Sequence, residues 1–242
     1  MVLYYAEGGS FNNLTKRNLS WYNDLHTLQN IAQGLGIIHE KKMVHRDFHI
    51  GNILLAYSDN TGSFISDMGL CGEVGNVDAT KIYGVMPYVA PEVLRGKPYT
   101  QAANIYSFGM VMYFVATYRQ PFADCAHDEV LAMQICNGIR PEITEKDAPK
   151  CYIDLMKKCW DLNPDNRPSV KKLPGRIESF RISNDEEIIS QFEKAYKYKK
   201  ENLSIIDYQK THPQAIYTSR LLNSYTTGLN DKTDWNEGKN DQ

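Results

Sequence analysis

The sequence predicts a mainly α-helical fold with only short β-hairpins, followed by a helical tail at the C-terminal end. The first observation is the run QAANIYSFGMVMYFVATYRQP, residues 101–121, which is apolar nearly all round until Pro121 stops it. A helix that is apolar on every side lies buried at the centre of a domain. The second observation is the helical spacing of apolar residues over 24–41, and the third is that β-prone runs are short and lie near residues 53–66.

Taken in order, the first long element is a helix over residues 24–41, whose apolar residues recur at helical spacing. The segment VHRDFHIGNILL, residues 44–55, follows and ends in a short buried strand, ILL. The turn SDNTG and a second short strand, FIS, complete a small hairpin. Residues 66–94 are rich in Gly and Pro and lack periodicity, which indicates a loop.

The second half of the chain predicts further helices at DEVLAMQICNG and PKCYIDLMKKCW, residues 128–138 and 149–160. Another begins after Ser169, and Pro174 with Gly175 should end or kink it. The tail, residues 184–202, has one apolar stripe opposite a lysine-bearing polar face, which predicts a docked surface helix. The stripe consists of Ile188, Ile189, Phe192 and Tyr196.

Composition limits the classes of partner and the compartment. The 242 residues carry 27 basic and 29 acidic side chains, a net charge of -2, so no global field favours nucleic acid or an anionic membrane. The five cysteines are odd in number and form no CxxC pair, which indicates a reducing compartment. No apolar run is long enough to span a membrane and no signal peptide is recognisable, so a cytoplasmic protein is expected.

The pair His45 and His49 raises the question of a metal site. Two histidines four residues apart with an acid between them would lie on one face of a helix and bind zinc, as in a metal-dependent hydrolase. Here the pair lies between a helix and a strand, in a predicted loop, and no third ligand has the right spacing. The sequence therefore argues against zinc.

A different set of residues carries a stronger signal. Asp47 and Asn52, then Asp67 in SDMG, then the triplet Ala90-Pro91-Glu92 occur in this order with short connections. Together they resemble the protein kinase superfamily, and specifically its larger, mostly helical lobe, over roughly residues 1–180. The resemblance implies a protein-kinase-like C-terminal lobe, consistent with the mainly α fold class predicted above.

The resemblance implies a site for ATP and Mg²⁺. Asp47 would orient and deprotonate the substrate hydroxyl, while Asn52 and Asp67 would hold magnesium, for which their oxygen atoms are suitable hard ligands. Asp47, Asn52 and Asp67 are thus the expected catalytic residues, within reach of one magnesium-phosphate site. The adenine would contact the segment that joins the two lobes, together with a residue of the first buried strand. These cofactor-binding residues are Leu3, Tyr4, Ala6 and Leu54.

Other positions match the same lobe. Arg46 corresponds to the residue that pairs with a phosphate on the activation segment, about residues 67–92, where Thr80 and Tyr83 are candidate acceptors. The resemblance also implies a buried ion pair between Glu92 and Arg167. The pair Cys159-Trp160 resembles a pattern of the tyrosine-kinase-like and tyrosine kinase groups. Trp160 is equally compatible with a packing residue of a helical core.

The chain departs from the family pattern at several positions. Met68 replaces a Phe and should still pack. His49 and Val85 match neither the serine/threonine nor the tyrosine kinases, so the hydroxyl type stays open between Ser/Thr and Tyr. Asn104 replaces the Asp that braces the catalytic loop; its amide accepts a hydrogen bond but brings no charge, so a looser loop is expected.

The largest departure is that the 242 residues contain no glycine-rich phosphate loop, no VAIK-type lysine and no partner glutamate for it. The expected organisation is a kinase domain limited to the C-lobe portion over 1–180, a helical tail extension over 181–222 and a disordered end over 223–242. The expected function is a protein kinase that is truncated and inactive alone, with a protein substrate.

The alternative is a non-catalytic, pseudokinase-like interaction or scaffold module. A protein partner would then bind the tail helix or the surface that faces the smaller lobe in the family. That surface should be partly apolar and open.

Overall fold

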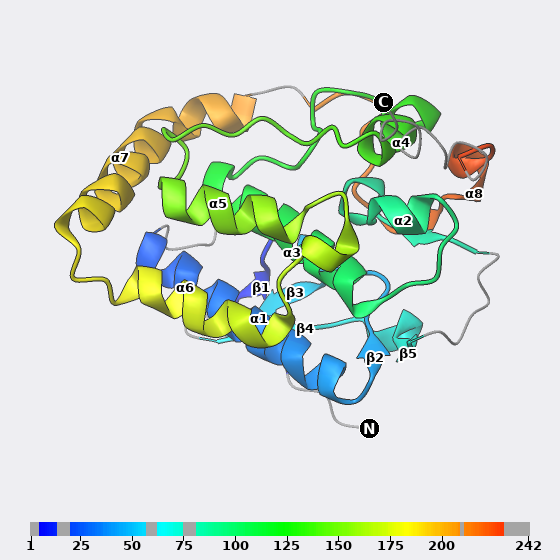
Figure 1. Cartoon of the computed structure of the whole chain (residues 1–242). Helices are drawn as coiled ribbons and strands as arrows, with labels where there is room; N and C mark the ends of the chain where they lie inside the picture. Colours follow the sequence, from blue (N-terminus) through cyan, green and yellow to red (C-terminus); the bar gives the residue numbers. More distant parts are fainter. Residues whose placement is uncertain (1–4, 14–19, 57–61, 75–80, 209–210, 230–242) are drawn as a thin grey trace, which may run out of the picture.

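The computed structural model describes residues 5–13, 20–56, 62–74, 81–208 and 211–229, with side chains excluded for 203–208. The chain folds around helices, as the sequence predicts, with short antiparallel strand pairs at its edges (Figure 1). The helices are α1 Trp21–Glu40, α2 Pro91–Leu94, α3 Gln101–Thr117, α4 Glu129–Cys136, α5 Lys150–Cys159, α6 Leu173–Arg181, α7 Glu186–Tyr208 and α8 Asn223–Thr226.

The strands form small separate sheets rather than one large sheet. β1 Gly9–Ser10, β3 Ile53–Leu55 and β4 Ser63–Ile65 make one sheet in the order β1-β3-β4, with Ile53 opposite Ile65. β2 Met43–Val44 pairs with β5 Gly72–Glu73, and β6 Tyr83–Gly84 pairs with β7 Arg220–Leu221. All these pairings are antiparallel, and the β3–β4 hairpin is the one predicted from the sequence.

Helix α3 is the central core element, and Figure 1 shows it between α5 on one side and α1 with α6 on the other. Its residues from Ala103 to Thr117 are all buried, as expected for a helix that is apolar all round. Close packing against α5 depends on Gly109, because a Cβ there would lie 3.1 Å from Cys159 Cβ and 3.2 Å from Trp160 Cβ. Cys159 and Trp160 are themselves buried core residues, as predicted.

Helix α1 begins at Trp21, earlier than the predicted residue 24, because Ser20 caps its start. The Ser20 side chain accepts a hydrogen bond from the Asn23 backbone N–H at 3.1 Å. The prediction that Pro174 ends or kinks a helix was wrong. Pro174 lies in the first turn of α6, where its missing N–H would have no partner in any case.

The tail helix α7 docks on the domain through most of the predicted stripe, since Phe192 is buried and Ile188 and Tyr196 pack against the core. Phe192, Ala195 and Lys199 are buried, whereas Ile189 is exposed. Lys199 was expected on the polar face; its Nζ instead donates to the Val115 carbonyl at 2.8 Å and lies over the Trp21 ring. A lysine thus takes a core position because a carbonyl and an aromatic face receive its charge.

After α7 the described chain returns across the molecule to α8, which lies against α4 (Figure 1). Residues 223–229 do not follow the expectation of a disordered end, since they form α8 and a buried contact at Leu229. Residues 230–242 lie outside the described residues. No helix in the described part of the chain is both long and apolar enough to cross a bilayer.

Candidate active site

The loop between β2 and β3 carries Asp47 into the interior. Arg46 has φ of 68°, a left-handed conformation that a non-glycine residue adopts only when its surroundings hold it there. His45, Asp47 and His49 are all buried, although each has a polar side chain. Buried polar groups must be hydrogen-bonded, so the partners of this loop define its geometry.

Asn104 of α3 braces the loop from below. Its Oδ1 accepts a hydrogen bond from the His45 backbone N–H at 3.0 Å and contacts His39 Nε2 at 3.2 Å. Burial lowers the pKa of His39, which keeps this imidazole neutral, with its Nε2–H as the donor. The amide oxygen therefore receives two hydrogen bonds, whereas the sequence interpretation allowed one.

The two histidines considered above as zinc ligands contact the backbone of the loop. His45 Nε2 donates to the Ser66 carbonyl at 2.9 Å, and its Nδ1 faces the Asp47 N–H at 3.4 Å. Burial also lowers the pKa of His45. His49 Nδ1 accepts the Gly51 N–H at 3.1 Å. Both rings thus direct nitrogen atoms at backbone groups, and within the described residues no group of three or more metal-ligating side chains is found.

The Asp47 carboxylate is buried, with one oxygen left for a ligand. Asn52 Nδ2 donates to Oδ2 at 3.3 Å, whereas His49 Nε2 lies 3.6 Å from Oδ1, too far for a full hydrogen bond. Oδ1 has no partner of ordinary hydrogen-bond length among the described residues. This buried oxygen is therefore the one whose hydrogen-bonding capacity is not used within the described residues.

Asp47 is ionised at neutral pH. Burial acts to raise its pKa, but polar contact with His49, the field of that ring, and smaller contributions from Ser219 and His45 outweigh burial. The resulting pKa lies below the ordinary value of an aspartate. A carboxylate held in its charged form can accept a hydrogen bond or a proton from a hydroxyl.

Ser66 links Asn52 to Asp67. The Ser66 backbone N–H and Oγ both donate to the Asn52 carbonyl, at 2.8 and 3.0 Å, which fixes the end of β4 against the catalytic loop. Asn52 Nδ2 also donates to the Asp47 carbonyl at 2.9 Å. Asp67 follows directly, in a left-handed conformation with φ of 55°, and its side chain is exposed. The chain thereby connects the three predicted catalytic residues in one hydrogen-bonded region.

The predicted adenine contacts are only partly described. Leu3 and Tyr4 lie outside the described residues. Ala6 precedes β1, and its carbonyl accepts the Gly9 N–H at 3.0 Å. Leu54 lies in β3 opposite Ser10 of β1 and is half-buried, so these two positions belong to the same small sheet region.

The activation segment is anchored at its end by the predicted ion pair. Arg167 Nη1 and Nη2 donate to the two Glu92 oxygens at 2.7 and 2.8 Å. Arg167 also donates to the Ala102 carbonyl at 2.9 Å, and its side chain is fully buried. The bidentate geometry is the strongest form of such a pair, and it joins the segment to the start of α3.

Other parts of the activation segment differ from expectation. Met68 was expected to pack but is 45% exposed, because the short turn over Met68–Leu70 lies on the surface. Arg46 donates to the Glu73 carbonyl at 3.3 Å and lies against the backbone of Gly72. Thr80 lies outside the described residues, and the Tyr83 side chain is partly exposed in β6.

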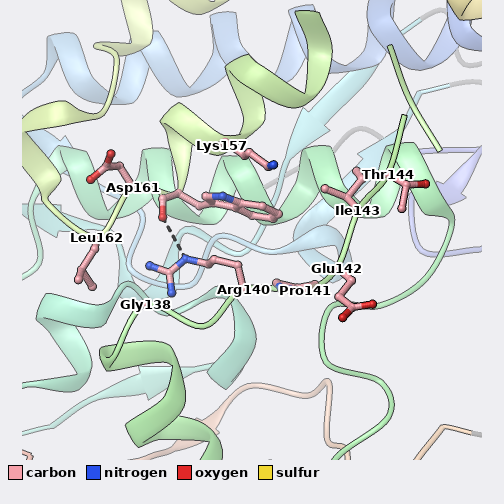
Figure 2. Close-up of a pocket in the computed structure, with 10 residues that line it drawn as sticks. Gly138, Arg140, Pro141, Glu142, Ile143, Thr144, Lys157, Asp161 and Leu162 are labelled. Carbon is pink, nitrogen blue, oxygen red and sulfur yellow. Dashed lines mark hydrogen bonds between the residues drawn. The ribbon is translucent and has the colours of Figure 1, made fainter. Parts of the chain in front are cut away.

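A separate open pocket lies away from these residues, between the segment after α4 and the end of α5. Figure 2 shows Lys157, Asp161 and Leu162 on one side and Arg140 on the other. Arg140 Nε donates to the Trp160 carbonyl at 3.0 Å, the dashed line in Figure 2. Because no predicted site residue lines it, we place the candidate active site at Asp47 and not in this pocket.

A family model described as the protein kinase domain matches residues 1–175. The chain belongs to the protein kinase family. Among its relatives, a probable serine/threonine-protein kinase of Dictyostelium discoideum is 32% identical over 78% of this chain. Human mitogen-activated protein kinase kinase kinase 7 is 31% identical over 72% of the chain, and an RGS domain-containing serine/threonine-protein kinase A of Dictyostelium discoideum is 29% identical over 73%.

This kinase chain matches only part of each relative. The matched region is 14% of the length of the first, 30% of the second and 16% of the third. The family assignment therefore applies to the kinase region, and the activity and substrates of the complete relatives are not transferred with it.

The kinase site contains residues that the motif comparison did not identify. Ser66 was recognisable only as the neighbour of Asp67, although it holds Asn52 in place. His39 contacts Asn104 from within α1, and its sequence position carries no signal beyond its place at the end of a helix. Ser219 lies in the returning tail and contributes to the pKa of Asp47, and no pattern in its surroundings pointed to the active site.

Proposed function

We propose that this protein transfers the γ-phosphoryl group of ATP to a serine or threonine hydroxyl of a protein substrate. The observation that carries the proposal is the ionised, buried Asp47 carboxylate with its free Oδ1, held beside Asn52 and, through Ser66, Asp67. Phosphoryl transfer relies on positioning and charge neutralisation, and this group of residues supplies a positioned base and oxygen ligands for a cation that would neutralise charge.

In this proposal Asp47 Oδ1 accepts a hydrogen bond from the substrate hydroxyl and receives its proton as the oxygen becomes the nucleophile. Its pKa, which contact with His49 lowers against the opposing effect of burial, keeps the carboxylate charged for that role. The two histidines keep the loop in shape, since His45 contacts the Asp47 N–H and His49 faces Oδ1. Asn104 acts through His45, so it is a positioning residue.

The residues present fit Mg²⁺. Asn52 uses its amide nitrogen on Asp47, so its side-chain oxygen is the atom suited to a cation. The exposed Asp67 supplies a carboxylate, and hard oxygen donors are the ligands that Mg²⁺ prefers. When bound with ATP, the ion neutralises charge on the phosphates. We therefore propose Asn52 and Asp67 as its protein ligands.

The preference for Ser or Thr over Tyr is supported by the relatives, whose names specify serine/threonine-protein kinases. Val85 and His49 do not decide it from the sequence. Phosphoamino-acid analysis of a protein substrate labelled by an active form of this chain tests the preference. Label on serine or threonine is expected, and label confined to tyrosine would contradict it.

We further propose that residues 1–180 are the larger-lobe portion of a kinase domain and residues 181–222 a tail extension. By itself the polypeptide of residues 1–242 should bind Mg-ATP weakly and transfer phosphate negligibly. It contains no glycine-rich loop and no VAIK-type lysine, and a charge-assisted phosphate contact is worth about 1.5–3 kcal/mol. Losing it lowers affinity by about tenfold to a hundredfold.

The experiment compares the 242-residue chain with a fusion that carries a generic smaller kinase lobe ahead of Met1. Calorimetry with Mg-ATP measures binding, and transfer of radiolabel from ATP to a generic protein substrate measures activity. Weak binding and negligible transfer by the chain alone, with both restored in the fusion, are expected. Micromolar binding and rapid transfer by the chain alone would refute the claim of dependence on a second lobe.

A non-catalytic interaction module is the second candidate function. One observation favours it: several large apolar side chains within residues 64–74 are substantially exposed. They are Phe64, Met68, Leu70 and Val74, with exposures of 46, 45, 38 and 44%. Exposed apolar groups gathered in one segment favour association with another protein surface. A fusion that binds Mg-ATP without transferring phosphate would favour this candidate.

A further inference from the structure

The segment of the tail that includes β7 lies on the activation segment beside Asp47. Its strand pairs antiparallel with β6, with Leu221 opposite Tyr83 and Arg220 opposite Gly84. The Leu222 N–H donates to the Ile82 carbonyl at 2.7 Å, and the Ile82 N–H donates to Asn223 Oδ1 at 2.9 Å. The tail thus adds a strand to the edge of the segment.

The register brings the tail to the catalytic carboxylate. Gly84 has φ of 142°, and a Cβ built on it would lie 3.6 Å from Asp47 Oδ1, so β6 passes directly beside the base. Arg220 is opposite Gly84, and Ser219 precedes it. The Ser219 hydroxyl lies close enough to the Asp47 carboxylate to lower the pKa of that group. A serine hydroxyl group therefore stands at the carboxylate proposed as the base.

The strand is held at the surface mainly through its backbone and through anchors on either side. Ser219 and Leu221 are exposed, whereas Leu222 is fully buried. Arg220 between them is half-buried, so burial alternates along the strand and only Leu222 is fully enclosed. Backbone pairing with one fully buried anchor is typical of an extended peptide that is bound at a sheet edge.

The anchor before Ser219 is built around His127. Its Nδ1 accepts the Ile216 N–H at 3.1 Å, its Nε2 contacts the Phe122 carbonyl at 3.0 Å, and its backbone N–H donates to the Gln214 carbonyl at 3.0 Å. The Tyr217 hydroxyl donates to the Pro121 carbonyl at 3.0 Å.

The anchor after Ser219 is Arg220 with the start of α8. Arg220 Nη2 donates to the His127 carbonyl at 2.6 Å, and its guanidinium lies over the Tyr225 ring, 4.6 Å from the centroid. Helix α8 packs on α4. Both ends of the strand are thereby fixed, which holds Ser219 at Asp47.

We propose that residues 216–222 occupy the peptide-substrate position of this kinase, with Ser219 at the place of the acceptor hydroxyl. The inference rests on the proposed function, in which Asp47 binds the acceptor hydroxyl, and it specifies the class of substrate. A substrate would be an extended peptide that pairs with β6 and presents a serine or threonine followed by a basic and then apolar residues. An external peptide binds only after the tail segment leaves.

The test uses the full 242-residue chain and needs no phosphoryl transfer. Ser219→Asp places a second negative charge against the ionised Asp47, while Thr218→Asp adds the same charge at the neighbouring exposed residue. Hydrogen exchange at the Leu222 amide reports docking of the segment. We expect exchange about tenfold faster or more in Ser219→Asp and unchanged in Thr218→Asp, because charges repel most strongly at short range.

A fluorescent peptide with the sequence of residues 214–229, QAIYTSRLLNSYTTGL, is the binding probe. It should bind the Ser219→Asp chain and not the unaltered chain, whose own segment fills the site. Adding Asp47→Asn to Ser219→Asp should restore slow exchange and abolish peptide binding, since the repulsion is removed. The rescue separates a specific contact with Asp47 from general destabilisation of the tail.

Equal exchange in Ser219→Asp and Thr218→Asp, no rescue by Asp47→Asn, or equal peptide binding by the unaltered chain would each overturn the proposal. These outcomes are independent of the proposed function. If Ser219→Asp alone releases the segment but the lobe fusion transfers no phosphate, the docking proposal stands and the proposed kinase function is wrong. If the fusion transfers phosphate but Ser219→Asp does not release the segment, the kinase function stands and the docking proposal is wrong.

Discussion

At the scale of single residues, the catalytic loop depends on neutral histidines around one charged carboxylate. His45 and His39 stay neutral because burial lowers their pKa, and through Asn104 they hold the loop that carries Asp47. Asp47 stays charged because contacts with His49 outweigh the effect of burial on its pKa. Two neutral rings thus support the loop, while the charged carboxylate remains as the base.

Replacing Asp47 with Asn tests the role of its charge. In an active form of the chain, such as the lobe fusion, Asp47→Asn should lower the transfer rate by about 10² to 10⁴, because the amide cannot accept the hydroxyl proton. Mg-ATP affinity should change little, since Asn52 and Asp67 are the proposed ligands. Radiolabel transfer and calorimetry measure the two effects, and an unchanged transfer rate would rule out Asp47 as the base.

Acidification should destabilise the fold below about pH 6.5. Burial lowers the pKa of His39, His45 and His127 in the folded chain. The unfolded chain, with an ordinary histidine pKa near 6.5, binds more protons as the pH falls, so the free energy of unfolding decreases. Thermal melting between pH 7.5 and 5.5 checks this.

A lower Tm at pH 5.5 is expected, and the difference should shrink in His127→Gln, because glutamine does not titrate in this range. The charge of Arg220 disfavours the protonated form of His127, whereas the charge of Asp128 favours it. Burial is the largest influence on the pKa of His127. A Tm that is constant or rises on acidification would contradict the account.

At the scale of elements, the ion pair between Glu92 and Arg167 connects the activation segment to α3. Replacing Glu92 with Gln leaves a fully buried guanidinium without its charge partner. Removing one member of such a pair costs about 3–5 kcal/mol, which corresponds to a decrease in Tm of about 10 °C for a chain of this size. Calorimetric melting measures it.

The exposed pair of Lys150 and Asp154 provides the matched control, since its partners are 64 and 51% exposed. Asp154→Asn should leave the Tm unchanged, because water solvates both charges and surface pairs contribute little. If Glu92→Gln also melted like the unaltered chain, the buried pair would not be a structural anchor.

Helix α7 provides a second test at this scale. Lys199→Met removes the hydrogen bond to the Val115 carbonyl and the contact with the Trp21 ring, 3.9 Å from its centroid. We expect a loss of about 1–3 kcal/mol in the free energy of unfolding and faster hydrogen exchange in α7. Lys197→Met, at an exposed position of the same helix, should show neither effect. Equal behaviour of the two variants would mean that Lys199 does not dock the helix.

Prediction from the sequence succeeded where local patterns determine structure. The all-apolar run of α3 and the spacing in α1 specified buried helices, and the order of Asp47, Asn52, Asp67 and Glu92 indicated the protein kinase family, which the family model confirms. It failed where tertiary partners decide. Lys199 is buried because Val115 and Trp21 receive its charge, and the polar segment of residues 211–229 is ordered because β6 and α4 offer it a surface.

At the scale of the whole molecule, the tail connects the far ends of the domain. Helix α7 docks beside α1 and α3 through Lys199, and the chain then returns to the activation segment, where β7 pairs with β6. Figure 1 shows this path from α7 across to α8. The described residues therefore combine a kinase-type catalytic loop with a segment of the same chain that covers it.

The central claim is that Asp47, Asn52 and Asp67 form a site for phosphoryl transfer. The most direct measurement is transfer of γ-phosphoryl radiolabel from Mg-ATP to a protein substrate by the lobe fusion, compared with its Asp47→Asn variant at matched Mg-ATP occupancy. We expect rapid, Mg²⁺-dependent labelling by the fusion and a loss of about 10² or more in the variant. A fusion that binds Mg-ATP but transfers no label, or a variant that labels as fast as its parent, would contradict it.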